Sequence, residues 1–177
     1  MMFNEFLEFF GSNRQINITG SSYDTFLDNF EGQSFGEGLF RAFDKKKIAY
    51  WENTVSTAYP HFKNQFNLFG YDWLGRCFAI DLRNNTKGNI LMFEIGTKDV
   101  LEIPCDFLNF LNQEIPQYTD ACLALNFYRE WLMVSKKFIS NYRCVGYKVP
   151  LFLGGEDSID KIEDIDMDGY WHILSKL

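Results

Sequence analysis

Apolar residues in the first sixty positions recur at the spacing of an α-helix, i, i+3, i+4 and i+7. This spacing predicts helices over residues 3–10 and 22–30, and a third helix between Asp44 and Pro60. Ser22 and Asp44 are suitable N-caps, because their side-chain oxygens can accept hydrogen bonds from free backbone amides. A short strand is expected at 39–43. The apolar positions that carry the helical pattern are Phe3, Phe6, Leu7, Phe10, Tyr23, Phe26, Leu27, Phe30, Ile48, Trp51 and Val55.

The middle of the chain changes to the alternating pattern of β-strands. Residues 66–71 are aromatic and extended in character, and Phe78, Ile80 and Leu82 alternate with less apolar neighbours. Two further strands are expected at 90–95 and 100–103, with turn sequences before each of them. Short turns join antiparallel neighbours, so the pattern predicts an antiparallel meander of at least three strands.

Helical spacing returns after Pro104. One helix is expected up to Pro116, and a longer helix from about Thr119 to Phe138. The final residues, 167–177, again fit a helical stripe. These elements predict an α+β fold, with helices packed on the meander, in one domain of 177 residues. Within it, residues 1–60 form a mostly helical N-terminal portion, and residues 61–177 carry the sheet and the C-terminal helices. The expected apolar face of the long helix comprises Leu123, Phe127, Trp131, Val134 and Phe138.

The segment 149–168 stands out from the rest of the chain. An apolar run, 149–153, ends at Gly154 and Gly155, and such a pair marks a sharp turn out of a buried segment. We therefore expect 150–155 to be docked in the core. Seven carboxylates follow within thirteen residues, against the single basic residue Lys161. They are Glu156, Asp157, Asp160, Glu163, Asp164, Asp166 and Asp168.

Residues 146–160 resemble the C-terminal signature of immunity proteins that accompany DNase effectors of type VI secretion. The signature residues are Gly146, Pro150, Gly154 and Gly155, and Lys161 departs from the Asn that relatives usually carry. Residues 38–44 resemble the end of the GAD-like N-terminal portion of such proteins. Residues 69–81 are more weakly similar to a segment of SUKH-type immunity proteins. The resemblance implies an α+β fold that binds a toxin, with no catalytic activity of its own.

Composition narrows the function classes. Apolar residues make up 46% of the chain, which excludes a disordered protein. The formal net charge is −7, which disfavours direct contact with nucleic acid. The four cysteines form no paired motif and are expected to be buried and reduced. We find no secretory signal and no apolar run of membrane-spanning length, so a cytoplasmic protein of a bacterium is expected.

Two short motifs suggest chemistry. Residues 32–36 match the Gly-x-Ser-x-Gly elbow of serine hydrolases, with Ser34 as nucleophile. The elbow requires a strand before it and a helix after it, and here the predicted order is reversed. Residues 164–169 reproduce the first half of a calcium loop, but Ser175 replaces the carboxylate required at position 12. We expect no enzyme activity, no cofactor and no metal.

The sequence leaves two function classes open. The first is a non-enzymatic immunity protein that neutralises a toxin, a nuclease, through protein–protein contact. The second is a small-ligand or calcium-binding protein, or an enzyme using the glycine-rich loop or the acidic turn. Tyr71 and Trp73 are a further candidate contact region, whereas a hydrated surface is the other interpretation of the acidic run. The carboxylates expected to contact the partner are Glu156, Asp157, Asp160, Glu163 and Asp164.

Overall fold

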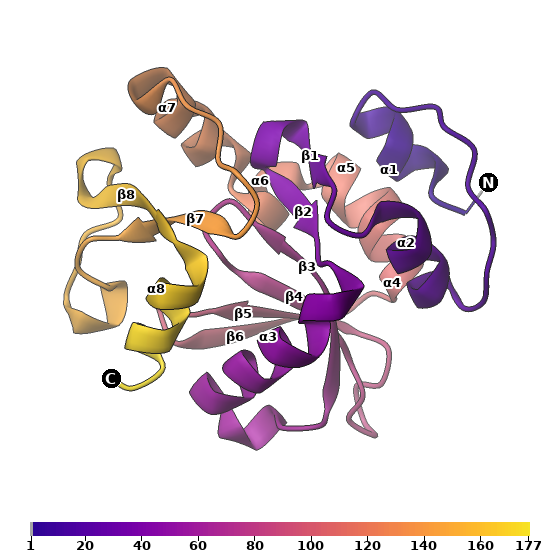
Figure 1. Cartoon of the computed structure of the whole chain (residues 1–177), viewed down its shortest axis with the longest axis horizontal. Helices are drawn as coiled ribbons and strands as arrows, with labels where there is room; N and C mark the ends of the chain where they lie inside the picture. The colour runs from indigo at the N-terminus through magenta and orange to yellow at the C-terminus, as the bar shows by residue number, and fades with distance from the viewer. Residues whose placement is uncertain (1) are drawn as a thin grey trace.

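The computed structural model describes residues 2–177 and has the α+β architecture that the sequence predicts (Figure 1). The helices are α1 (Asn4–Phe9), α2 (Ser22–Phe30), α3 (Lys45–Ala58), α4 (Phe107–Asn109), α5 (Ile115–Gln117), α6 (Thr119–Leu123), α7 (Leu125–Ser135) and α8 (Met167–Leu174). The strands are β1 (Ser34–Phe35), β2 (Phe40–Ala42), β3 (Phe66–Asp72), β4 (Cys77–Asp81), β5 (Ile90–Glu94), β6 (Asp99–Ile103), β7 (Arg143–Tyr147) and β8 (Ile162–Asp166). Across residues 2–177, none of the helices is both long and apolar enough to cross a bilayer.

The predicted meander is confirmed and is longer than expected. Six strands, β1 to β6, pair in sequence order, and every pair is antiparallel. β1 and β2 come from the N-terminal sixty residues, so that portion of the chain belongs to the same sheet as the middle. A second sheet contains only β7 and β8, paired from Arg143↔Asp166 to Tyr147↔Ile162.

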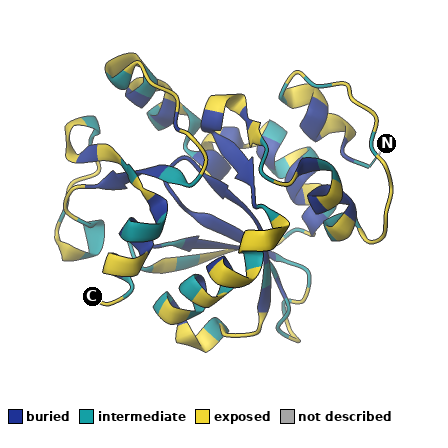
Figure 2. Cartoon of the chain, viewed as in Figure 1, coloured by how far each residue is buried: buried dark blue, intermediate teal, exposed yellow. Residues whose placement is uncertain are grey.

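The large sheet lies between two layers of helices, and Figure 2 shows its central strands as buried. Successive side chains of a strand point to opposite faces, so neighbours in β3 enter different cores. Phe69 packs in the cluster that contains residues of α1, α2, α4, α6 and α7. Leu68 and Tyr71 pack in the other cluster, with residues of α3 and α8, because a register shift between Leu68 and Gly70 interrupts the alternation and puts Tyr71 on the same face as Leu68. Both faces of the sheet are therefore hydrophobic, and this buries nearly all of β3 to β5.

Two helix caps differ from the predictions. α2 is capped by Ser21 instead of Ser22, in a capping box where Ser21 and Asp24 exchange hydrogen bonds between side chain and backbone. Asp44 does precede α3, but its side chain makes no capping hydrogen bond. It accepts a hydrogen bond of 2.7 Å from the Tyr142 hydroxyl instead. A tertiary contact has therefore replaced a local one, and it ties α3 to the chain before β7.

The helices after Pro104 depart most from the predictions. Pro116 does not end its helix, because a π-helical turn at Phe110–Glu114 precedes it and Pro116 lies in the first turn of α5. The long helix expected from Thr119 is broken at Ala124, which adopts a left-handed φ of 51°. α7 then ends at Ser135, and its C-cap Lys136 is also left-handed. Val134 and Phe138, predicted to be buried, are 70% and 65% exposed.

The carboxylate of Asp81 is buried at the end of β4 and is expected to stabilise the fold in a pH-dependent way. Burial opposes its ionisation, but hydrogen bonds from Arg83, at 2.7–3.1 Å, and from Thr86 outweigh burial and lower its pKa. A carboxyl group whose pKa is lower in the folded protein than in the unfolded chain stabilises the fold at pH values above its unfolded pKa, which is near 4. This stabilisation is lost as the pH falls through the folded-state pKa.

Replacing Asp81 with asparagine should lower the free energy of unfolding at pH 7 by about 1–3 kcal/mol, because hydrogen bonds to a charged group are lost. Urea denaturation at pH 7 and at pH 3 measures the effect, and the difference between variant and parent should shrink at pH 3. Glu8→Gln, on the exposed side of α1, is the control and should change neither value. An equal loss at both pH values would contradict this account of Asp81.

Candidate functional site

The turn that joins β7 to the acidic residues is held by backbone hydrogen bonds. The carbonyl of Pro150 accepts hydrogen bonds from the amides of Leu153, at 2.9 Å, and Gly155, at 3.1 Å. The amide of Leu151 donates to the carbonyl of Gly96 at 3.0 Å, which fastens the turn to the loop after β5. The two sheets are therefore joined at this turn, and the acidic chain that follows starts from a fixed point.

The prediction that 150–155 docks in the core is wrong. Residues 151–153 form a 3₁₀ turn with no buried residue, and Leu151 and Phe152 are only half-buried. Val149 and Leu153 are 52% and 54% exposed. A single 3₁₀ turn spreads its three side chains around its axis, so they cannot all face the protein. The segment lies at the rim of the molecule and is attached mainly through its backbone.

The glycines of the sequence signature are explained by close packing at Gly146 and Gly155 and by backbone conformation at Gly154. A Cβ atom on Gly155 would lie 1.8 Å from the backbone oxygen of Val149. Gly154 adopts a φ of +87°, a conformation that side chains other than glycine disfavour. A Cβ atom on Gly146 would lie 2.8 Å from the ring of Tyr170, so this glycine lets α8 approach β7. Gly146, Pro150, Gly154 and Gly155 therefore have structural roles.

Gly155→Ala is expected to lower the free energy of unfolding by about 1–3 kcal/mol, because the added methyl group meets backbone atoms that cannot rotate away. Thermal and urea denaturation measure the loss. Gly20→Ala is the matched control, since its Cβ would meet only the flexible side chain of Asp24 at 3.2 Å. Equal stability of the two alanine variants would contradict the close contact at Gly155.

The five carboxylates that the sequence analysis selected are all exposed, and we call them the acidic face: Glu156, Asp157, Asp160, Glu163 and Asp164. Three of them accept hydrogen bonds from neighbouring side chains. Asp157 accepts from the Tyr147 hydroxyl at 2.9 Å, and Asp164 from Arg143 at 2.7 Å. The carboxylate of Asp160 accepts a hydrogen bond from the Ser158 hydroxyl. This hydrogen bond lowers the pKa of Asp160, and the smaller effect of Lys161 lowers it further. Within residues 2–177, no ion pair or hydrogen bond engages the side chains of Glu156 and Glu163.

A half-buried carboxylate, Glu94, lies near Asp157 of the acidic face. Burial raises the pKa of Glu94, at the end of β5, and Arg76 opposes this effect. Asp72, Asp99 and Asp157 raise it further by electrostatic repulsion. Burial also raises the pKa of Tyr147, as does its hydrogen bond to Asp157, so its hydroxyl remains a donor at neutral pH. Asp157 is therefore the member of the acidic face that lies close enough to Glu94 for the two carboxylates to repel each other.

A buried ion pair holds the β3–β4 turn, and the sequence analysis did not find it. Nε of Arg76 donates to the carboxylate of Asp72 at 2.6 Å, and Nη2 donates to the carbonyl of Cys122 at 3.1 Å. Asp72 also accepts the backbone amides of Leu74 and Arg76, each at 3.0 Å. The pair therefore fixes both the turn and its contact with α6. The spacing Asp-x-x-x-Arg around Gly75 was the only signal in the sequence.

Arg41 is a second buried charge that the sequence analysis passed over. Its Nη1 donates to the carbonyls of Ser140, at 2.7 Å, and Arg143, at 2.9 Å. Its guanidinium lies 4.9 Å from the centre of the Tyr71 ring, and Nε and Nη2 have no hydrogen-bond partner among the described residues. Arg41 thus links β2 to the chain that enters β7, and so connects the two sheets.

Tyr71 and Trp73 do not form a contact region for a partner. They are 1% and 0% exposed, and the indole Nε1 of Trp73 donates to the carbonyl of Leu123 at 2.9 Å. Trp73 also packs against Tyr128 and Trp131 of α7, with ring centres 5.0 and 6.4 Å apart. Both aromatic residues were predicted to contact a partner, but both are buried inside the protein.

The two chemical motifs do not adopt the geometry that their chemistry requires. Ser34 lies in β1 after helix α2, so the strand–turn–helix order of an elbow is absent at this position. Asp164 and Asp166 lie in strand β8 instead of a loop, and Asp166 caps α8 by accepting the amide of Gly169 at 2.7 Å. Asp168 accepts the Tyr50 hydroxyl at 2.7 Å. Within the described part of the chain, no three His, Cys, Asp or Glu side chains gather closely enough to hold a metal ion.

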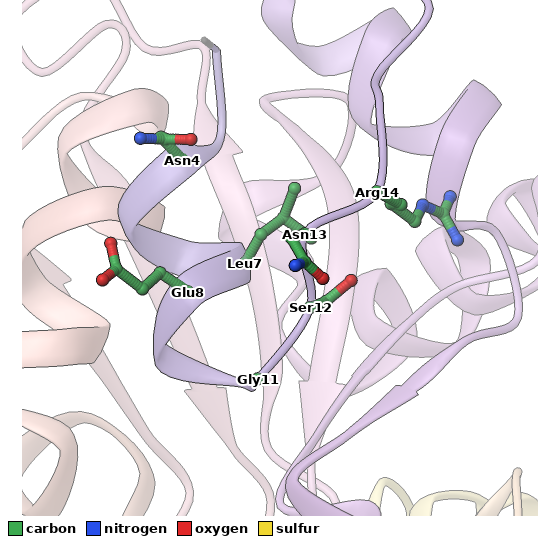
Figure 3. A pocket seen from close by; sticks show the side chains of 7 residues that line it. All are labelled: Asn4, Leu7, Glu8, Gly11, Ser12, Asn13 and Arg14. Atoms are coloured by element: carbon green, nitrogen blue, oxygen red, sulfur yellow. The ribbon is translucent and has the colours of Figure 1, made fainter.

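A cavity of about 470 Å³ lies beside α1 and the loop that follows it (Figure 3). Glu8 and Arg14 point to opposite sides in this view, so they do not form a paired site. Arg14 is occupied elsewhere, because it donates to Gln33 at 3.0 Å and lies 4.5 Å from the centre of the Phe30 ring. The cavity therefore presents no arrangement of acid, base or nucleophile. It is lined by Asn4, Leu7, Glu8, Gly11, Ser12, Asn13 and Arg14.

Comparison with known proteins supports the fold. No family model matches the chain, and no curated protein matches it. Among solved structures, the chain is similar to Atu4351 from Agrobacterium tumefaciens, with a TM-score of 0.63 and 15% sequence identity. The match covers 99% of this chain and 89% of that chain. At this identity the similarity shows a shared fold.

Proposed function

We propose that this chain is a non-enzymatic immunity protein, which binds and neutralises a nuclease toxin in the bacterial cytoplasm. The observation that carries the proposal is the acidic face, which is exposed and built on a turn fixed by backbone hydrogen bonds. The resemblance of residues 146–160 to the signature of immunity proteins points to the same region. Three of the signature residues, Pro150, Gly154 and Gly155, lie in the turn, and Glu156 of the acidic face follows it directly.

A nuclease is the kind of toxin that such a surface fits. Nucleases bind the phosphate backbone of their substrate through lysine and arginine side chains, so their active surfaces are basic. An acidic surface is complementary to them and raises the rate of encounter. Binding at that surface would block access of nucleic acid, and the chain itself needs no catalytic group to do so.

The acidic face has features that a merely hydrated surface does not require. Asp157 is oriented by the buried Tyr147, which limits its motion before a partner binds. Glu156 and Glu163 lie on either side of it along the chain and have no side-chain partner among residues 2–177, so both are free to pair with basic groups. A surface that is partly ordered in advance loses less conformational entropy on binding.

Growth protection tests the proposal. The product of the gene immediately upstream is expressed in a host cell with and without this chain. We expect that product to kill the host alone, to be neutralised on co-expression and to copurify with this chain. A product that remains toxic and forms no complex would count against the proposal. The Glu156→Lys/Glu163→Lys variant should protect less well than the parent at equal expression.

A further inference from the structure

The connection between β7 and β8 carries exposed apolar side chains next to the acidic face. It is closed at its base, where the amide of Lys148 donates to the carbonyl of Lys161 at 2.9 Å. Val149 and Leu153 lie inside this connection and are 52% and 54% exposed. The first three carboxylates of the acidic face lie in the same connection. We call residues 149–153 the apolar turn.

Two apolar side chains of the turn contact the body of the protein, and two do not. Leu151 packs against the core cluster that contains residues of α1 and α2, and Phe152 packs against the cluster with residues of α3 and α8. Nζ of Lys98 also lies 5.2 Å from the centre of the Phe152 ring. Among the described residues, Val149 and Leu153 belong to neither cluster. Attachment of the turn therefore explains Leu151 and Phe152, but it does not explain Val149 and Leu153.

The backbone of the apolar turn is fixed before any partner binds. The amides of Leu151 and Phe152 both donate to the carbonyl of Gly96, at 3.0 and 3.4 Å. The amide of Gly154 donates to the carbonyl of Leu151 at 3.0 Å. An apolar side chain on a fixed backbone is buried by a partner at little cost in conformational entropy.

We propose that Val149 and Leu153 form the apolar anchor through which this chain holds its toxin. The anchor rests on the proposed function, and it requires a partner surface of one kind: an apolar depression bordered by lysine and arginine side chains. The apolar turn enters the depression, and the acidic face pairs with the basic border. Protein interfaces have this arrangement, with an apolar, desolvated centre inside a polar rim.

Charge selects this occupant over the alternatives. Lys148 and Lys161 both contact Asp160, through its carbonyl at 2.9 Å and its carboxylate at 3.0 Å. Glu156 and Asp157, which follow the turn, have no cationic partner among residues 2–177. Their negative charge repels an anionic membrane and nucleic acid. A second copy that met the same face would place these carboxylates against each other, whereas a basic protein surface neutralises them.

The apolar anchor and the acidic face should act on different rate constants. Charge at the rim controls the rate of encounter, whereas apolar contacts at the centre control the lifetime of the complex. Leu153→Ser should therefore raise the dissociation rate constant by about tenfold, and leave the association rate constant within about twofold of the parent value. Val149→Ser should act in the same direction. Leu153→Met keeps an apolar side chain of similar volume and should restore most of the lifetime.

Surface plasmon resonance with the purified product of the gene immediately upstream, at low and high salt, provides the measurement. Ile18→Ser is the matched control and should change neither rate constant. Ile18 is 70% exposed in the loop between α1 and α2, and Figure 1 shows that loop on the opposite side of the molecule from β7 and β8. All of these variants should melt close to the parent, because the replaced side chains are exposed.

The results distinguish failure of the anchor from failure of the function on which it rests. If the parent binds the product and Leu153→Ser and Val149→Ser dissociate no faster, the anchor is overturned and the proposed function stands. An equal effect of Ile18→Ser also overturns the anchor. A parent that does not bind the product overturns both. Binding of the parent to phosphatidylcholine vesicles that Leu153→Ser abolishes would assign the turn to a membrane and overturn the anchor.

Discussion

Replacing Trp73 with alanine is expected to lower the free energy of unfolding by about 3–5 kcal/mol. The indole is fully buried between the large sheet and α7, and it packs on the rings of Phe127, Tyr128 and Trp131. Its removal would leave a cavity and also an unsatisfied carbonyl at Leu123. A loss of this size is a large part of the stability of a small domain, so the variant should melt well below the parent.

Tyr118→Ala is the control for Trp73→Ala. Tyr118 is 57% exposed, and within the described residues its side chain makes no hydrogen bond, so its loss should change stability by less than about 1 kcal/mol. Circular dichroism melting and urea denaturation measure both variants. A stable Trp73→Ala variant that loses partner binding would return Trp73 to the role of a contact residue and contradict its place in the core.

Reversing charge on the acidic face should slow toxin binding without unfolding the protein. Glu156→Lys with Glu163→Lys is the preferred variant, because these two carboxylates have no partner within residues 2–177 and their replacement breaks no contact. At low salt we expect the association rate constant to fall by about tenfold or more, and its salt dependence to flatten. The melting temperature should hardly change. Stopped-flow mixing with the toxin domain at low and high salt provides the measurement.

Glu5→Lys with Glu8→Lys is the matched control for the charge reversal. It changes the net charge by the same amount, but it lies on α1, away from β8 (Figure 1). If both variants slow association equally, the overall charge of the protein controls encounter and the acidic face has no special role. If neither variant slows it, the toxin binds a different surface, and the proposed contact residues are wrong.

Strands β2 to β6 and most helices were predictable because their signals are local, whereas β1 and the two strands of the second sheet, β7 and β8, were not predicted. Alternation at 78–82 and helical spacing at 22–30 depend on short stretches of sequence, and tertiary contacts preserved both. The breaks around α7 were not predictable. Ala124 is a favourable helix residue, and its left-handed conformation reflects the way α6 and α7 pack against other elements. The expected apolar face of one long helix was therefore wrong at Val134 and Phe138.

The exposure of the acidic face was predictable from its charge density, since unpaired carboxylates avoid burial. The position of the glycine turn was also predictable, but the prediction that it is buried was wrong. Backbone hydrogen bonds to Gly96 hold the turn at the rim of the molecule. The burial of the charges Asp72, Arg76 and Arg41 was not predicted, and the spacing of Asp72 and Arg76 around Gly75 was too weak a signal to indicate it. Their partners are backbone carbonyls and side chains brought together only by the fold, as with Cys122 and Ser140.

Titration of nuclease activity tests the proposed function most directly. Purified toxin domain is held at a fixed concentration, well above the dissociation constant, and DNA cleavage is followed as this protein is added. We predict that cleavage falls linearly and stops at a fixed molar ratio, and that separation of the two proteins restores it. Inactivation by much less than one equivalent, growing with time, would show that the protein is an enzyme. Undiminished cleavage at excess protein would contradict the proposal that it is an immunity protein for a nuclease.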